Sequence, residues 1–256
     1  MTVQKPKVKS ADRVLDILEL FTGEQDHYNL TEISRSLNMP PSSTYQLIQN
    51  MVDRGYLEEE KSGKRFRIGY KLFMIRSRYM QGTSLTSEFY QLAERIIHDV
   101  NETVSLAIRR DDQLLYIAEK VSTRPLRYTP NLGGTLPLHA TASGKVFLAY
   151  LDEEELLALY PQQELEPVTA KTIRSFSSLL QELKLVREQG FGYNEGETVE
   201  GVHCIAGPVW DHEHQVAAAV SISIPEVRMT EGVRRKLHEI IRQACNELTY
   251  RVFQQQ

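Results

Sequence analysis

Residues 30–68 constrain the fold of this chain more than any other segment, because their pattern predicts a complete structural unit. Thr31 is expected to cap a first short helix that ends near Leu37. Pro40-Pro41 then introduces a second helix, and Gly55 supplies its stop signal. Two short stretches with strand character follow, joined by a turn: residues 56–60 and 65–68. Two helices in tight succession, with a hairpin behind them, predict a winged helix-turn-helix.

The second helix of this unit, from about Ser42 to Arg54, is expected to have two unlike faces. Its apolar residues repeat at helical spacing, whereas the opposite face is polar and lacks the Glu/Lys mixture of an ordinary solvated helix. Such side chains can hydrogen bond to base edges while basic residues of the hairpin reach flanking phosphates. The candidate DNA-contacting residues are Ser42, Ser43, Tyr45, Gln46, Gln49, Asn50, Arg65 and Arg67. The alternative is an ordinary helical hairpin packed in a core.

Composition agrees with a soluble globular chain that is long enough for two domains: 256 residues, 41% hydrophobic and 25% charged. No apolar run approaches the length that spans a bilayer, and the cysteines, Cys204 and Cys245, are too few for a disulfide framework. These features favour a cytoplasmic protein. Residues 1–80 carry 13 Lys and Arg against 10 Asp and Glu, whereas residues 81–256 carry 17 against 24. A weakly basic first part and an acidic remainder suit a protein whose first part alone contacts phosphate.

The chain changes character after a break at residues 81–84, and from Thr103 its hydrophobic period becomes two. Strands are expected at residues 103–110, 114–120, 124–129, 191–194, 202–209 and 215–224. Outside the helix-turn-helix, helices are expected at residues 10–21, 70–80, 85–100, 141–151, 175–189 and 230–253. Helices that bracket a mostly antiparallel sheet predict an α+β domain.

The helix expected at residues 141–151 begins with small side chains, hydroxyls and free backbone N–H groups. Such a start favours an anion, particularly a carboxylate or a phosphate. It is not a nucleotide-binding P-loop, because His139 stands where the first Gly should be and Val146 follows Lys145. Close helix packing on small side chains explains the same pattern equally well.

Catalytic and metal-binding chemistry finds little support in the sequence. His203 and Cys204 are adjacent on a strand and point to opposite faces, so they cannot easily share a site. Cys204 also lies in an apolar string, where an inert buried thiol is the default. Cysteine or histidine spacing typical of zinc is absent, and neither a cofactor nor an enzymatic activity is predicted.

The sequence resembles the IclR family of bacterial transcriptional regulators nearly from end to end. The resemblance is carried by Leu30-Thr31-Glu32-Ile33, Pro40 to Met51, Arg65 to Leu72, Pro137 to Lys145 and Gly201 to Val209. It implies a winged helix-turn-helix domain at residues 1–69, a linker helix at 70–83 and a GAF-like α/β effector-binding domain at 84–256. Because members of the family assemble as dimers or tetramers, a homodimer or homotetramer on a palindromic double-stranded DNA operator is expected.

The resemblance also implies where a small organic-acid effector would bind. Carried over by position, the effector-binding residues are Ala142, Ser143, Gly144, Asn194, Cys204, Ser221 and Ser223. Ser221 and Ser223 are two residues apart on one strand and should share a face. Weaker candidates for apolar walls are Leu132, Leu138 and Ile222. Position 194 is Asn where the family commonly has Asp, and the missing negative charge should make an acid easier to hold.

The expected function is therefore that of an IclR-type transcriptional regulator, such as a repressor, whose operator binding responds to a small organic acid. Two alternatives remain open. One is a metabolite-sensing protein or enzyme that uses the winged helix for protein contacts, and the other is a nucleoid-type DNA binder without an effector. The sequence leaves open the effector, the operator and target genes, the choice between repression and activation, and the choice between dimer and tetramer.

Overall fold

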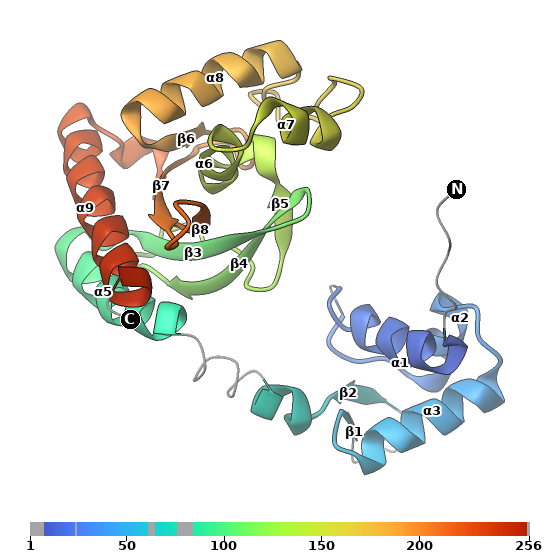
Figure 1. Ribbon diagram of the computed structural model, residues 1–256. Coiled ribbons are helices and arrows are strands. Elements are labelled where there is room, and N and C mark those ends of the chain that lie inside the picture. The colour runs from blue at the N-terminus through green and yellow to red at the C-terminus, as the bar shows by residue number, and fades with distance from the viewer. Residues whose placement is uncertain (1–7, 24, 61–64, 76–83, 255–256) are drawn as a thin grey trace. The chain divides into compact units, whose positions relative to one another are not determined.

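The computed structural model describes residues 8–23, 25–60, 65–75 and 84–254 (Figure 1). The chain divides into two compact units, Met1–Gly82 and Thr83–Gln256, and each has its own buried core. The turn of the expected wing, at residues 61–64, and the end of the expected linker helix, at residues 76–83, lie outside the described residues. In the part of the chain that is described, no helix is both long and apolar enough to cross a membrane.

The N-terminal unit is a winged helix-turn-helix, as the sequence predicts. Its elements are α1 (Lys9–Leu20), α2 (Leu30–Ser36), α3 (Pro41–Asp53), β1 (Leu57–Glu59) and β2 (Phe66–Ile68). The two strands pair antiparallel. Ile17, Ile33, Ile48 and Leu57 are fully buried where the helices and the hairpin meet. Burial of these side chains holds the short elements together, since helices of this length are marginal alone.

The expected cap at Thr31 is wrong, because Asn29 caps α2. The Glu32 N–H donates to Asn29 Oδ1 at 2.9 Å, and the Asn29 N–H donates to the Glu32 carboxylate at 2.7 Å. This reciprocal pair is a capping box, in which the side chain of a Glu or Gln three positions after the cap accepts the cap's N–H. Asn29 and Glu32 have that spacing, so the helix begins at Leu30 and Thr31 lies inside its first turn.

The C-terminal unit is built on an antiparallel sheet of six strands in the order β5-β4-β3-β8-β7-β6. The strands are β3 (Thr103–Arg110), β4 (Gln113–Lys120), β5 (Thr135–Pro137), β6 (Gly192–Glu195), β7 (Val202–Trp210) and β8 (Val216–Pro225). One face is covered by α5 (Ser84–Val100) and α9 (Glu231–Thr249) (Figure 1). The other face is covered by α6 (Ala142–Ala149), α7 (Glu153–Leu159) and α8 (Phe176–Gln189). This arrangement confirms the expected α+β class.

The side chains of strand β8 alternate between the two faces of the sheet. Val220 and Ile222 point toward α5 and α9, where they join an apolar core. Ser221 and Ser223 alternate with them and point toward α6 and α8, as Ala219 does. The expectation that Ile222 lines an effector site together with these serines is therefore wrong, because adjacent residues of a strand point to opposite faces.

Residues 124–129 form no strand, contrary to the expectation. Pro125 has no N–H to donate to a sheet ladder. The Arg124 guanidinium also donates to Glu102 Oε1 at 3.1 Å, which holds the segment beside the start of β3. Strand β5 pairs with β4 instead, so the chain between these two strands runs as a long loop at residues 121–134.

Helix α8 follows the sequence signals closely. Ser175 caps it by accepting a hydrogen bond from the Ser178 N–H at 3.2 Å. Gly190 ends it with a φ of +79°, a left-handed conformation that glycine adopts without the steric cost of a Cβ atom. The chain then enters β6, one of the two edge strands of the sheet.

Candidate functional site

Helix α3 presents the predicted DNA-contacting residues on the side opposite its core. Thr44 and Ile48 are fully buried, and Thr44 Oγ1 also donates to the Pro40 carbonyl at 3.0 Å. The polar residues between these positions point outward. Ser42, Tyr45, Gln46 and Asn50 are exposed, while Ser43 and Gln49 are half-buried. The structure thus brings these side chains together on one accessible face of α3.

The arginines of the predicted wing differ in their surroundings. Arg67 donates two hydrogen bonds to Glu58 Oε2, at 3.1 and 2.8 Å, and Glu58 Oε1 accepts the Tyr70 N–H at 3.2 Å. Arg65 is exposed and has no ion pair within the described residues. Arg65 is therefore free to contact a phosphate group. Arg67 would have to give up its hydrogen bonds to Glu58 before it could make such a contact.

On the C-terminal unit, the sheet face toward α6 carries two rows of polar side chains in register. The first row, across four strands, is Thr103, Ser223, Cys204 and Asn194. The second row is Glu119, Ser105 and Ser221. Side chains directly opposite each other on paired strands point to the same face. The predicted effector residues of β6, β7 and β8 therefore lie on one face of the sheet.

The start of α6 packs against this face. Thr141 caps the helix by accepting the Gly144 N–H at 2.9 Å, whereas the N–H groups of Ala142 and Ser143 donate to none of the described residues. Ser143 is 1% exposed, and its hydroxyl has no partner there either. A helix start with free donors carries a partial positive charge and favours an anion. We call the first turn of α6 and the two polar rows together the cup.

Gly144 has a packing role. A Cβ atom at this position would lie 2.1 Å from the Leu138 carbonyl oxygen, so only glycine fits. Its N–H is already used by the cap. Leu138 is fully buried in the core around α6, and Leu132 is 37% exposed on the surface. The packing interpretation thus holds for Gly144, while Ala142 and Ser143 keep donors that are free for a ligand.

Asn194 uses its whole amide within the protein. Its Nδ2 donates to the Ala140 carbonyl at 2.9 Å and to Thr198 Oγ1 at 2.8 Å. Its Oδ1 accepts the N–H groups of Gly196 and Glu197 at 3.0 and 2.8 Å. A side-chain amide has two donors and two acceptor positions, so none is left over. A ligand contact by Asn194 would therefore require one of these bonds to break.

The surroundings of Cys204 do not suit nucleophilic or metal chemistry. Its Sγ lies 3.2 Å from Ser223 Oγ, and burial raises the pKa of the thiol to about 11. The thiol is therefore neutral at physiological pH and unreactive. His203 points away from it and lies 3.8 Å from a Glu226 carboxylate oxygen. Within the ranges that the structure describes, no group of three or more His, Cys, Asp or Glu residues is placed to hold a metal ion.

Sequence reasoning missed a polar group at the β4 side of the cup. Ser105 is fully buried, and neither its hydroxyl nor Glu119 Oε2 has a partner among the described residues. Tyr116 is also buried here. Tyr128, from the 121–134 loop, has a raised pKa because it is buried and because Cys204 and Glu119 lie nearby. One signal was present in the sequence, since Thr103 and Ser105 alternate with the apolar Val104 and Leu106 in the first half of the strand.

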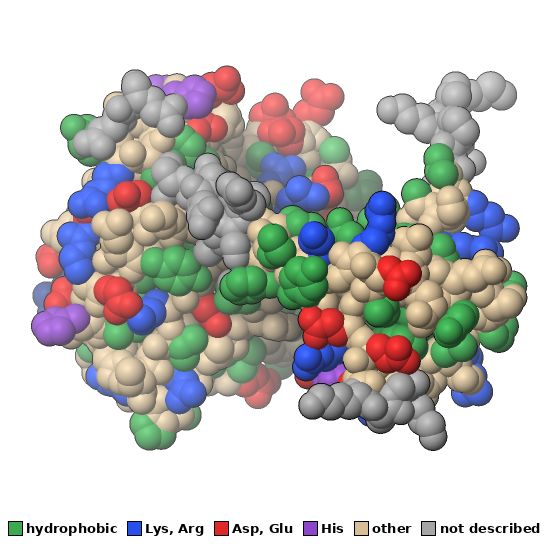
Figure 2. Space-filling view, turned by 90° about the horizontal axis from the view of Figure 1, so that it is seen from below, with side chains coloured by type: hydrophobic (Ala, Val, Ile, Leu, Met, Phe, Trp, Pro, Cys, Tyr) green, Lys and Arg blue, Asp and Glu red, His purple; other side chains and the backbone are tan. Residues whose placement is uncertain are grey.

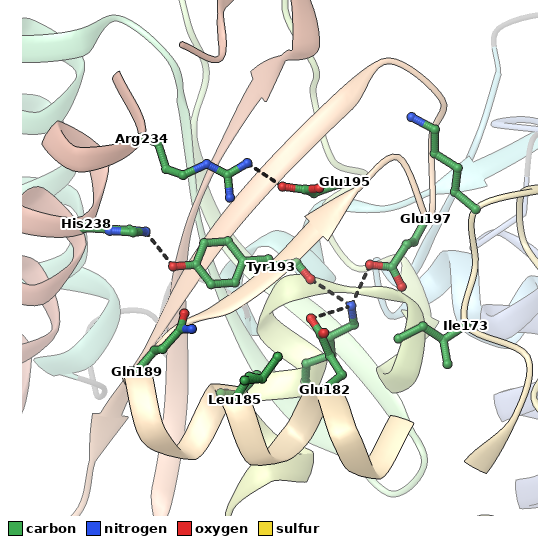
Figure 3. Close-up of a pocket in the computed structure, with 12 residues that line it drawn as sticks. Ile173, Glu182, Leu185, Gln189, Tyr193, Glu195, Glu197, Arg234 and His238 are labelled. Atoms are coloured by element: carbon green, nitrogen blue, oxygen red, sulfur yellow. Dashed lines mark hydrogen bonds and ion pairs between the residues drawn. The ribbon is translucent and has the colours of Figure 1, made fainter. Parts of the chain in front are cut away.

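An open cleft of about 540 Å³ lies beside the cup, between β6, α8 and α9 (Figure 3). Lys145 reaches it from α6 and is held by Glu197 at 2.5 Å, by the Tyr193 carbonyl at 3.0 Å and by Glu182 at 3.4 Å. On the other side of the cleft, Arg234 pairs with Glu195. Lys145 and Arg234 are thus both compensated by carboxylates, which favours a structural role for these pairs.

Comparison with known proteins agrees with this geometry. The family described as IclR helix-turn-helix domain matches residues 10–61, and the family described as bacterial transcriptional regulator IclR C-terminal matches residues 77–250. The chain is 33% identical over 251 residues to the HTH-type transcriptional regulator KdgR of Dickeya chrysanthemi. That alignment covers 96% of this chain and 82% of KdgR.

Solved structures share the fold. The IclR transcriptional regulator of Alicyclobacillus acidocaldarius has a TM-score of 0.87 at 19% identity, over 95% of this chain and 98% of that one. An IclR homolog from Microbacterium hydrocarbonoxydans, crystallised with 4-hydroxybenzoate, has a TM-score of 0.84 at 23% identity, over 94% of this chain and 97% of that one. The curated relatives are regulators and repressors of transcription, and this chain is accordingly a DNA-binding regulator and not an enzyme. The protein belongs to the IclR family of bacterial transcriptional regulators.

Proposed function

We propose that this regulator binds its operator through α3 and the wing, and that a small organic acid in the cup controls that binding. One observation carries the proposal. At the start of α6, the buried Ser143 hydroxyl and the N–H groups of Ala142 and Ser143 have no partner among the described residues. Buried polar groups are rarely left unpaired, because each such group costs free energy. A carboxylate supplies the acceptors that these donors lack and suits the charge of a helix start.

The relative from Microbacterium hydrocarbonoxydans supports the ligand class, since its crystals contain 4-hydroxybenzoate, an organic acid. For control of transcription, the acid must bind one arrangement of the DNA-binding units more tightly than another, because equal affinity shifts nothing. The candidate ligand contacts are Ala142, Ser143, Cys204, Ser221 and Ser223. Asn194 contributes by holding the turn after β6 against the Ala140 carbonyl.

We also propose a cytoplasmic homo-oligomer on a palindromic operator. Residues 70–75 are helical, and their large apolar side chains are between 50% and 69% exposed: Tyr70, Phe73, Met74 and Ile75. Figure 2 shows exposed hydrophobic side chains, drawn in green, among the polar ones of the face that it presents. An exposed apolar patch of this kind is typical of a contact between chains, and two-fold symmetry is the common way to extend a short DNA site.

An operator pull-down from genomic fragments, followed by release with candidate acids, tests the proposed function. Ser143→Leu should fill the cup and abolish release, while operator affinity stays unchanged. Ser177→Leu, at an exposed position on α8, is the matched control. A Ser143→Leu protein that still responds to the true effector at the same concentration would place the effector elsewhere. Failure of every acid to release the DNA would favour a nucleoid-type role.

A further inference from the structure

We infer that the protein has a second small-molecule site, built by Tyr150, Phe191, Trp210 and Arg242, and that this site binds a purine mononucleotide. It is a hollow of about 190 Å³ between the ends of α6 and α8, the second half of β7 and the middle of α9. We call it the aromatic pocket. It shares no residue with the cup, so the inference does not depend on the proposed function.

The aromatic pocket exists because β6 is shorter than β7. Strand β6 pairs only with residues 203–206 of β7, so no described strand lies beside the outer edge of β7 at residues 207–210. The pairing of β7 with β8 also shifts between Val209 and Trp210, an irregularity that changes the direction of a side chain and is common beside functional sites. The Trp210 N–H donates to Thr249 Oγ1 at 3.0 Å. The end of β7 is therefore tied to α9 while one side of it stays open.

Three aromatic rings line this open side. Tyr150 and Trp210 meet edge to face, with their ring centroids 4.6 Å apart. Phe191 is 5% exposed, and the Arg242 guanidinium lies over its ring at 5.4 Å. Flat apolar rings suit a planar ligand, and a cavity of about 150 Å³ is enough to bind benzene. The aromatic pocket therefore has room for a planar base, while a sugar and a phosphate attached to it would lie at the rim.

The rim of the aromatic pocket is positively charged. The Arg242 guanidinium has no hydrogen bond or ion pair to any described residue, and none of the described residues that line the pocket is Asp or Glu. Arg187 donates to the carbonyls of Ala149 and Leu151, on either side of Tyr150 in sequence, and likewise has no carboxylate partner among the described residues. This contrasts with the acidic balance of residues 81–256, which carry 17 Lys and Arg against 24 Asp and Glu. Guanidinium groups without a carboxylate favour a phosphate, which they can bind through two parallel hydrogen bonds.

Two side-chain amides at the rim, those of Gln189 and Asn246, decide which kind of aromatic ligand fits. Both residues are exposed, and their amides bond to no described residue. An amide offers donors and acceptors together, which matches the polar edge of a nucleobase, as Asn and Gln match adenine in DNA recognition. A plain aromatic acid would leave both amides unused, and a cationic ring would be repelled by Arg242. A purine covers more of the aromatic surface than a single ring does.

Tryptophan fluorescence of the full-length protein, titrated with adenosine monophosphate (AMP), tests the inference. Trp210 is the only tryptophan of the chain, so its emission reports on this pocket. We expect AMP to quench the emission with a Kd of about 0.1–1 mM. Adenosine, which lacks the phosphate, should bind about tenfold more weakly, because it loses a charged hydrogen-bonded contact with Arg242. Benzoate and ribose 5-phosphate, which lack the base, should also bind at least about tenfold more weakly than AMP.

Several outcomes of this titration overturn the inference. They are no binding of AMP at about 10 mM, equal affinities for AMP and adenosine, and a benzoate affinity that matches that of AMP. Single-stranded oligoadenylate is a further probe, because it carries the same base and phosphate within a strand. If it binds more than about tenfold more tightly than AMP at equal base concentration, the pocket belongs to a nucleic-acid strand and not to a free nucleotide.

Variants at exposed positions of α9 assign the binding to the proposed residues without disturbing the core. Arg242→Gln should lower the affinity for AMP about tenfold, to that of adenosine, and leave adenosine binding unchanged. Arg235→Gln, at an exposed position of the same helix outside the pocket, is the matched control. Asn246→Ala should lower the affinities for AMP and adenosine by the same factor, because both carry the base. If Arg242→Gln keeps the preference for AMP over adenosine, the inference fails.

The cup variant separates this inference from the proposed function. Ser143→Leu should bind AMP as the wild type does, whatever its response to organic acids. Loss of AMP binding in Ser143→Leu would place the nucleotide in the cup and overturn the inference. An unchanged acid response in Ser143→Leu would contradict the proposed function alone.

Discussion

Lys145 is a charged residue that the fold buries almost completely, at 1% exposure. Its ammonium group is held by Glu197, Glu182 and a backbone carbonyl, while burial raises the pKa of Glu197 above its ordinary value (Figure 3). Removing one partner of a buried ion pair leaves the other charge without compensation. Lys145 therefore ties α6 to β6 and to the turn that Asn194 organises.

Replacing this lysine should destabilise the protein strongly. Lys145→Met keeps the length of the side chain but removes its charge, and we expect a loss of about 3–5 kcal/mol in the free energy of unfolding. Denaturant titration of the wild type and the variant measures it. Lys171→Met, at an exposed lysine of the same cleft, should change little. Similar losses in the two variants would contradict a special role for the buried pair.

His139 gives the stability a predictable dependence on pH. Its Nε2 lies 2.9 Å from the Glu166 carbonyl oxygen, and burial lowers the pKa of the ring below its ordinary value of 6.5. Below about pH 6.5, the unfolded chain therefore binds a proton at His139 more readily than the folded chain does. The stability from neutral His139 is present above about pH 6.5 and is lost as the pH falls through the lowered pKa. Melting temperatures across this window should fall less steeply for His139→Gln than for the wild type or for exposed His212→Gln.

At the scale of elements, the cap of α2 provides a direct comparison. Asn29→Ala removes the side-chain half of the capping box and should cost about 1 kcal/mol. Thr31→Ala, at an exposed position inside the first turn, should leave the stability unchanged or raise it by a few tenths of a kcal/mol, since alanine has a higher helix propensity than threonine. Urea titration distinguishes the two variants. A larger loss in the free energy of unfolding for Thr31→Ala than for Asn29→Ala would indicate that Thr31 is the cap.

Helix α3 and the wing should contribute to DNA binding in different ways. Gln46→Ala removes an exposed group that can read base edges, so discrimination between operator sequences should fall by about 1–3 kcal/mol. Arg67→Ala should weaken binding to all sequences alike and lower the salt dependence by roughly one ion. Fluorescence anisotropy with cognate and scrambled duplexes, at several salt concentrations, measures both effects. An unchanged sequence preference in Gln46→Ala would mean that α3 is placed in the wrong register.

Elements with strong local signals could be predicted from the sequence. The helix expected at residues 175–189 and the strand expected at residues 103–110 depend on residues close together in the chain, and both are confirmed. The strand expected at residues 124–129 fails because Pro125 and the bond from Arg124 to Glu102 prevent it from joining the sheet. Pro125 was a local signal against this strand. The bond from Arg124 depends on Glu102, which is distant in sequence, and it has no local signal.

At the scale of the whole molecule, strand order determines what the sequence could not show about the cup. Ser221 and Ser223 could be placed on one face by alternation alone. The meeting of Glu119, Ser105 and Ser221 depends on β3 lying between β4 and β8, which joins segments about a hundred residues apart. The sequence likewise could not show that the Asn194 amide is fully hydrogen bonded within the protein, because its oxygen accepts from backbone N–H groups of the turn that follows β6.

The exposed apolar helix at residues 70–75 leads to the last prediction, a homo-oligomer held partly by this surface. Phe73 is 69% exposed, and Phe73→Glu would place a charge in the proposed contact. We expect light scattering at micromolar concentration to show a dimer or tetramer for the wild type and smaller species for the variant. Val227→Glu, at an 81% exposed apolar residue of the C-terminal unit, is the matched control.

The DNA should report the same assembly. Dimers of helix-turn-helix proteins bind half-sites about 34–36 Å apart, so the footprint should be two-fold symmetric with that spacing. Loss of the oligomer in Phe73→Glu should weaken binding to the full operator far more than binding to an isolated half-site, because only the full site gains from linking two units. A wild-type monomer in solution, or equal effects of Phe73→Glu on both duplexes, would contradict an oligomer built on this surface.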